Sequence, residues 1–165
     1  MNSLLSIDPL KIEACLAALL CGFLIGFERQ WWGKPAGIRT SILVCMGAYT
    51  FMAIANFYQP GEGSLRVLGS LVTGVGFLGA GMMLSKEGIV QGVTSASIIW
   101  ILAAIGSLIA LENYQAAFTI TFITLFTLIG INLLEGAFKK LRRGVHKILK
   151  DEIESDDQNG AKENI

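Results

Sequence analysis

Four long stretches without a charged residue constrain this chain more than any other feature of its sequence. They are 18, 18, 19 and 21 residues long and cover 40–57, 67–84, 93–111 and 114–134. About 20 apolar residues in a helix cross the hydrocarbon core of a bilayer, and shorter stretches are accommodated by snorkelling. A fifth stretch, 10–27, includes Lys11 and Glu13 near its start. We therefore predict an all-α, polytopic membrane protein with five transmembrane helices.

The connections between these stretches carry unequal charge. Alternate connections and the C-terminal part hold ten Lys and Arg residues, whereas the opposite side holds two, Lys11 and Arg66. Because the side richer in Lys and Arg faces the cytoplasm, the N-terminus is predicted outside and the C-terminus in the cytoplasm. On the outer side, Glu13 is a candidate ion-pair partner for Arg66. The connection 112–113 has two residues, which predicts an antiparallel hairpin of the fourth and fifth helices.

The C-terminal part differs in composition from the rest of the chain. We predict a transmembrane domain over 1–136, a basic amphipathic helix on the cytoplasmic side over 137–153, and a disordered tail over 154–165. Six Lys and Arg residues lie within 139–150, and Phe138, Leu141 and Val145 recur at helical spacing. Such a helix can attract anionic lipid at the membrane surface. The alternative is that its charges only fix the orientation of the chain.

Glycine is concentrated in the stretch 67–84, which is predicted to form the third helix along the chain. Residues 74–79 of this stretch read GVGFLG. A dinucleotide site is excluded because no strand or βαβ pattern surrounds this motif. Small residues instead allow helices to approach closely in a membrane, so the third helix is expected at the centre of the bundle, between two neighbours. A cavity-lining broken helix is the alternative. The residues expected to mediate this helix packing are Gly22, Gly26, Gly69, Thr73, Gly74, Gly76, Gly79, Ala80 and Gly81, with Gly22 and Gly26 of the first helix as the partner surface.

The connection after the first stretch combines aromatic and basic residues. An ordinary interface accounts for its tryptophans, but a cation at a helix N-terminus, such as Arg39, requires an anion nearby. Glu28 is the candidate carboxylate, and a hydroxyl at 94–95 is expected to cap the fourth helix. With two helix N-termini, this face is predicted to bind a lipid headgroup, a phosphate or an acidic partner segment. Its proposed members are Glu28, Arg29, Trp31, Trp32, Lys34, Arg39, Thr40, Lys86 and Thr94.

Three motifs in this chain resemble the signatures of the MgtC/SapB membrane proteins. The first is GFLIGFERQW at 22–31 with KPAGIRT at 34–40, the second is GVGFLGAG at 74–81, and the third is GVTSA at 92–96, followed by Trp100 and AAIG at 103–106. The resemblance implies a bacterial inner-membrane protein with five helices, linked to magnesium homeostasis, acid or envelope stress, and virulence. Long members carry a cytoplasmic C-terminal domain, and we expect a short form without it here.

The sequence favours an interaction protein over an enzyme or a transporter. The four uncharged stretches contain no Asp or Glu, so a carboxylate-lined path for Mg²⁺ within one protomer is disfavoured. The chain has three cysteines and one histidine, His146, and their spacing fits neither a metal site nor a catalytic site. We expect no enzymatic activity, no cofactor, no metal site and no nucleic-acid partner. The expected partners are another inner-membrane protein and anionic lipids, with a homo-oligomer possible. An ion transporter or channel, with a pore at an oligomer axis, is the alternative.

Overall fold

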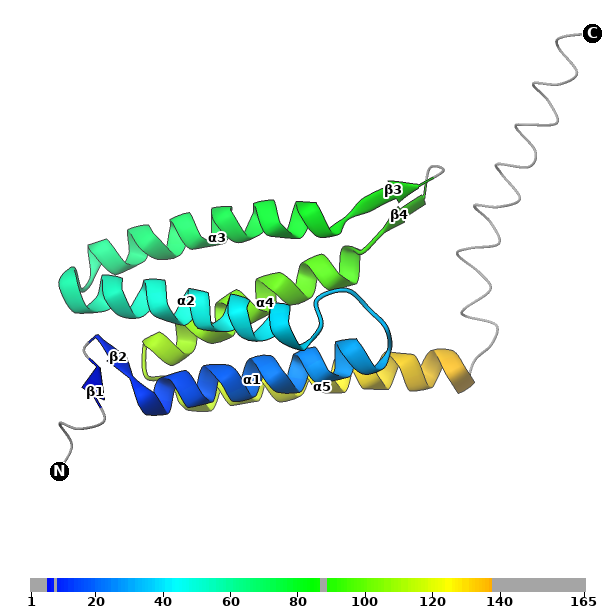
Figure 1. Cartoon of the computed structure of the whole chain (residues 1–165), viewed down its shortest axis with the longest axis horizontal. Coiled ribbons are helices and arrows are strands. Elements are labelled where there is room, and N and C mark those ends of the chain that lie inside the picture. The colour runs from blue at the N-terminus through cyan, green and yellow to red at the C-terminus, as the bar shows by residue number, and fades with distance from the viewer. Residues whose placement is uncertain (1–5, 8, 87–88, 138–165) are drawn as a thin grey trace, which may run out of the picture. The chain divides into compact units, whose positions relative to one another are not determined.

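The computed structural model describes residues 6, 7, 9–86 and 89–137, and five helices lie in this part of the chain (Figure 1). They are α1 (Ile12–Trp31), α2 (Ile38–Tyr58), α3 (Glu62–Met82), α4 (Val93–Ala110) and α5 (Tyr114–Ala137). The all-α prediction with five helices is confirmed. By length and composition, α2, α3, α4 and α5 can each cross a membrane. The remaining helix, α1, carries Glu13, Glu28 and Arg29.

The chain divides into two compact units, 1–126 and 127–165. The first contains α1 to α4 and the beginning of α5. In the second, the described residues are 127–137, which form the last part of α5. The amphipathic helix predicted at 137–153 and the tail predicted at 154–165 lie outside the described residues, apart from Ala137. The predicted orientation in the membrane is not tested by the fold and stays a prediction.

Two short antiparallel hairpins accompany the helices. β1 (Ser6–Ile7) pairs with β2 (Leu10–Lys11), and β3 (Leu84–Lys86) pairs with β4 (Ile89–Gln91). The sequence did not predict either hairpin. The uncharged stretch 67–84 was expected to span as far as Leu84, but α3 ends at Met82 and the next residue is already extended. Absence of charge marks the apolar run and does not mark the residue at which the helix ends.

The centre of the first unit is α2, and the prediction that the third helix is central is wrong. α2 packs against α1, α3 and α4, while α3 contacts α4 and α2 (Figure 1). In α3 only Ser64, Val75 and Gly79 are buried. Close approach of backbones occurs instead at glycines of α1 and α4 that face α2. Glycine content alone does not reveal which glycines meet a neighbouring backbone.

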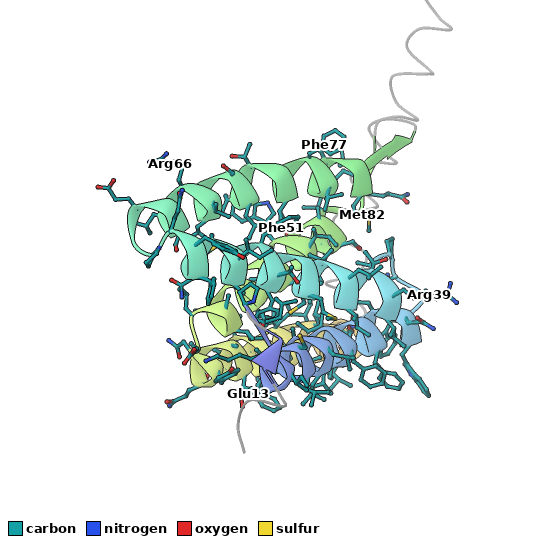
Figure 2. The ribbon with its side chains drawn as sticks, turned by 60° about the vertical axis from the view of Figure 1, so that its left-hand side comes forward. Glu13, Arg39, Phe51, Arg66, Phe77 and Met82 are labelled. Carbon is teal, nitrogen blue, oxygen red and sulfur yellow. The ribbon has the colours of Figure 1, made fainter. Side chains whose placement is uncertain are left out.

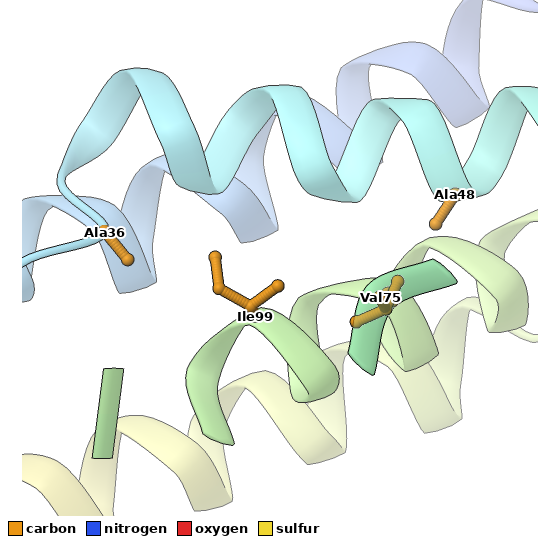
Figure 3. Packing of buried hydrophobic residues seen from close by; sticks show 5 residues of the cluster. Ala36, Ala48, Val75 and Ile99 are labelled. Carbon is orange, nitrogen blue, oxygen red and sulfur yellow. The ribbon is translucent and has the colours of Figure 1, made fainter. Parts of the chain in front are cut away.

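A small apolar cluster joins the loop after α1 to three helices. It consists of Ala36 from the loop, Ala48 of α2, Val75 of α3, and Ile99 and Ala103 of α4 (Figure 3). These side chains are at most 6% exposed. Between membrane helices, close packing of such side chains is favourable through van der Waals contacts. The cluster therefore fixes the loop between α1 and α2 relative to α4, which matters for the site described next.

Candidate functional site

The residues predicted to form an anion-attracting face gather at one end of the first unit. We call this the basic end and define it by residues 28–40 and 92–95, that is, the last turn of α1, the loop 32–37, and the first turns of α2 and α4. Figure 2 shows Arg39 and Met82 toward this end, and Glu13 and Arg66 toward the other. The loop thus brings together segments that lie more than 50 residues apart in the sequence.

Backbone hydrogen bonds fix the loop that follows α1. The N–H of Lys34 donates to the Arg29 carbonyl at 2.9 Å, and Gly33 turns the chain with a φ of 60°. Ala36 also has a positive φ, 63°, and is buried. The Ser41 hydroxyl donates to the Ala36 carbonyl at 2.9 Å. A non-glycine residue held in this left-handed region indicates a loop with a defined conformation.

Arg29 is the predicted site residue that is built most firmly into the bundle. Its side chain is 4% exposed, and its Nη2 donates to Ser95 Oγ, in the first turn of α4, at 2.8 Å. Within the described residues, its Nε is buried and has no hydrogen-bond partner. Glu28 is also buried, at 6% exposure. A buried cation therefore connects the C-terminal turn of α1 to the N-terminal turn of α4.

The other predicted members are exposed. Trp31 is 74% exposed and lies 5.8 Å, between ring centroids, from Phe27. Trp32 is half exposed. This aromatic edge fits the interface alternative as well as a binding role. The further exposed members are Lys34, Arg39, Thr40 and Thr94. The side chain of Lys86 lies outside the described ones.

The predicted cap of the fourth helix needs correction. Gly92, in the left-handed conformation with a φ of 91°, is the N-cap of α4, and no side chain caps this end. Ser95 is already within the first turn, so its hydroxyl accepts from Arg29 instead of capping the helix. Arg39 is exposed and Glu28 is buried, and the expected pairing of these two residues stays a prediction. Sequence reasoning missed the contact of Ser95 with Arg29, because one serine in a helix carries no signal of its partner.

At the opposite end, the observed ion pair differs from the predicted one. Lys11 Nζ pairs with Glu112 in the turn between α4 and α5, whereas Glu13 was expected to pair with Arg66. The hydrogen bond to Glu112, together with its charge, raises the pKa of the Lys11 ammonium above its ordinary value. The N–H of Lys11 also donates to Tyr49 Oη at 2.8 Å. Lys11 therefore connects the start of α1 to α2 and to the α4–α5 turn.

The predicted packing glycines fall into two groups. A Cβ added at Gly22 would lie 2.8 Å from Ile42 Cα, and one at Gly26 would lie 2.6 Å from Ile38 Cα. These two glycines therefore form a packing surface, but their partner is α2 and not α3. In α3, a Cβ at Gly79 would make only an ordinary contact with Ala96, at 3.7 Å.

The remaining small residues of α3 leave an open surface within the chain. Among the described residues, a Cβ added at any of its other predicted packing glycines would meet nothing within 4 Å. Thr73 and Ala80 are exposed as well. We call these residues the small-residue surface of α3, which has two faces roughly 120° apart. Gly69, Thr73, Gly76 and Ala80 lie on the first face, and Gly74 and Gly81 lie on the second. Side chains that could ligate a metal do not cluster in the described part, where no three of His, Cys, Asp or Glu lie together.

Comparison with known proteins adds a family to this geometry. The MgtC family model matches residues 15–137. Protein MgtC of Brucella abortus (strain 2308) is 39% identical over 136 residues, 79% of this chain and 56% of that protein. Protein MgtC of Salmonella typhimurium (strain 14028s / SGSC 2262) is 40% identical over 110 residues, 67% of this chain and 47% of that protein.

A third relative bears a different name. YhiD of Escherichia coli (strain K12), named as a candidate magnesium transporter, is 36% identical over 143 residues, 82% of this chain and 65% of that protein. The chain thus spans about half to two thirds of the length of the relatives it matches. No solved structure matches the chain.

Proposed function

Because the chain belongs to the MgtC family and carries several helices able to cross a membrane, we propose that this multi-pass membrane protein acts in the bacterial inner membrane without enzymatic activity. Its proposed role is in magnesium homeostasis, and in the stress and host-survival responses tied to it. We propose that it acts by binding another membrane protein. The names of its relatives support the magnesium link.

The observation that carries the binding role is the open small-residue surface of α3. Small residues in a membrane helix let a second helix approach closely, so that packing and polar contacts can form without a hydrophobic driving force. No described residue lies within 4 Å of a Cβ added at Gly69, Gly74 or Gly81. Each of the two faces therefore allows a helix of another protein to approach closely.

Capture from membranes tests this role. Gly69→Leu and Gly74→Leu place a large side chain on each of the two faces, at positions where an added Cβ meets nothing within 4 Å among the described residues. Gly47→Leu on α2 is the matched control, since a Cβ there also meets nothing within 4 Å. Overfilling a close interface costs about 1–3 kcal/mol, so capture of the partner by cross-linking should fall about 5- to 150-fold. Equal capture by all three variants would refute the α3 interface, and cross-links between identical chains would identify a homo-oligomer instead.

A magnesium transporter is the second candidate, and the name of YhiD favours it. The absence of Asp and Glu from 40–57, 67–84, 93–111 and 114–134 disfavours a carboxylate-lined path within one protomer. Purified protein in vesicles that enclose a magnesium-sensitive dye separates the two candidates. A magnesium flux above that of empty vesicles would favour the transporter. Absence of flux, together with capture of a partner through α3, would favour the interaction protein.

A further inference from the structure

Two positive features meet at the basic end, and each of them favours an anion. Arg29 Nη2 lies 2.8 Å from Ser95 Oγ, which places the guanidinium at the first turn of α4. The N-terminus of an α-helix carries a partial positive charge from its aligned peptide dipoles. A guanidinium beside a helix N-terminus is therefore unfavourable unless an anion lies between or beside them.

The hydrogen-bond donors at this place are the first amides of α4 and the Arg29 side chain. The first amides of a helix have no acceptor within the helix, and the N-cap of α4 is Gly92, which has no side chain to satisfy them. Arg29, at 4% exposure, also has its Nε buried without a partner among the described residues. A buried charged donor without a partner is costly. Both sets of donors point to an oxygen-rich acceptor.

Glu28 does not by itself account for this arrangement. Its charge interacts with that of Arg29, but Arg29 Nε remains without a hydrogen-bond partner among the described residues. The Glu28 carboxylate lowers the net positive charge of the basic end, whereas the Arg29 guanidinium donates a hydrogen bond to Ser95 of α4. Val93 and Thr94, the two residues after Gly92, are exposed, and the exposed fraction of Val93 is 54%. An anion can therefore approach the first amides of α4 over this surface.

We propose that Arg29 and the first turn of α4 bind one phosphate-type oxyanion. A guanidinium presents two parallel N–H donors that match the oxygens of phosphate, and helix N-termini bind phosphate through backbone amides. Exposed Lys34, whose N–H donates to the Arg29 carbonyl at 2.9 Å, adds positive charge that steers anions to this end. The phosphate comes either from a lipid headgroup or from free phosphate. This site is independent of the protein partner proposed for α3.

The test uses the full chain, purified in dodecyl maltoside, which contains no phosphate. Inorganic phosphate and phosphatidylglycerol are added separately, and sodium chloride at matched ionic strength is the control for screening. Thermal stability reports binding of either probe, and native mass spectrometry reports phospholipid retained on the protein. Arg29→Lys keeps the positive charge but removes the planar guanidinium with its two parallel N–H donors. Lys34→Gln removes an exposed cation from the same end and is the matched control variant.

For the wild type, a saturable rise in melting temperature is expected with one of the two probes and not with chloride. Arg29→Lys should weaken that binding about tenfold or more, while Lys34→Gln should weaken it much less. A shift with phosphatidylglycerol alone identifies a lipid headgroup, and a shift with inorganic phosphate identifies the free anion. The proposal fails if chloride acts equally well, if neither probe binds, or if Lys34→Gln matches Arg29→Lys. If Arg29→Lys does not fold, the wild-type comparison of the probes with chloride decides alone.

Discussion

Gly26→Ala tests whether the close approach of α1 to α2 holds the basic end in place. The added Cβ would lie 2.6 Å from Ile38 Cα, 2.9 Å from Ser41 Cβ and 3.0 Å from Ile38 N. Ordinary contact begins at 3.4 Å, so the two backbones must separate by about 0.8 Å at this point. A gap of 0.5–1 Å forfeits about a quarter to a half of the dispersion energy of each contact along the interface.

The cost of that separation can be worked out in order of magnitude. Overpacking costs about 1–3 kcal/mol, and the upper end applies because the contact is with backbone, which cannot rotate away. Alanine recovers up to about 1 kcal/mol through its helix propensity. The expected net loss for Gly26→Ala is therefore about 2 kcal/mol. Gly74→Ala, whose Cβ meets nothing within 4 Å, should be neutral or gain about 1 kcal/mol.

Reversible unfolding in mixed micelles, with increasing sodium dodecyl sulfate, measures both variants under the same conditions. The two should differ by about 2–3 kcal/mol in free energy of unfolding, with Gly26→Ala the less stable. Gly26→Ala should also lose the fixed position of the loop 32–37, which limited proteolysis would report. Equal stability of the two variants would refute the reasoning, because both glycines would then be equivalent positions in lipid-facing helices.

Three further substitutions follow from other contacts and use the same unfolding measurement. Gly106→Ala should cost about 3 kcal/mol, because its Cβ would meet the Cys45 carbonyl and lie 2.9 Å from Tyr49 N; no loss would mean that α2 and α4 are not in backbone contact. Tyr49→Phe removes the acceptor of the Lys11 N–H and should cost about 1 kcal/mol. Lys11→Met breaks an exposed pair with Glu112 and should cost less than about 1 kcal/mol, a loss that high salt should erase.

The membrane helices were predictable because the bilayer imposes a simple condition. A spanning segment must satisfy its own backbone and exclude charge, so charge-free runs and helices coincide. The run 40–57 falls within α2, Ile38–Tyr58, and the run 93–111 nearly matches α4, Val93–Ala110. The first helix was predicted to end at Phe27, yet it continues to Trp31. Charge ended the apolar run there but not the helix, because Arg29 is buried and bonds to α4.

The arrangement of the helices was not predictable in the same way. Gly26 and Gly74 look alike in the sequence, each within a run of small and apolar residues. A Cβ at Gly26 would meet the backbone of α2, whereas a Cβ at Gly74 would meet no described residue within 4 Å. The partner of Arg29 depends on the same long-range contacts, since Ser95 lies 66 residues away. Local pattern identifies which residues can allow a close approach or carry a charge, and only the packed structure identifies what they meet.

The glycines of α3 that meet no described residue affect the stability of this helix in a membrane. A glycine within a helix is about 1 kcal/mol less favourable than alanine, so Gly69, Gly74, Gly76 and Gly81 together weaken α3 by about 4 kcal/mol. Gly22 and Gly26 offset the same cost by allowing α1 and α2 to pack closely. No described residue approaches these four positions in the same way. The partner helix that we propose for α3 would compensate for this weakness by packing closely against it. The weak packing of α3 is therefore an argument for assembly in the membrane.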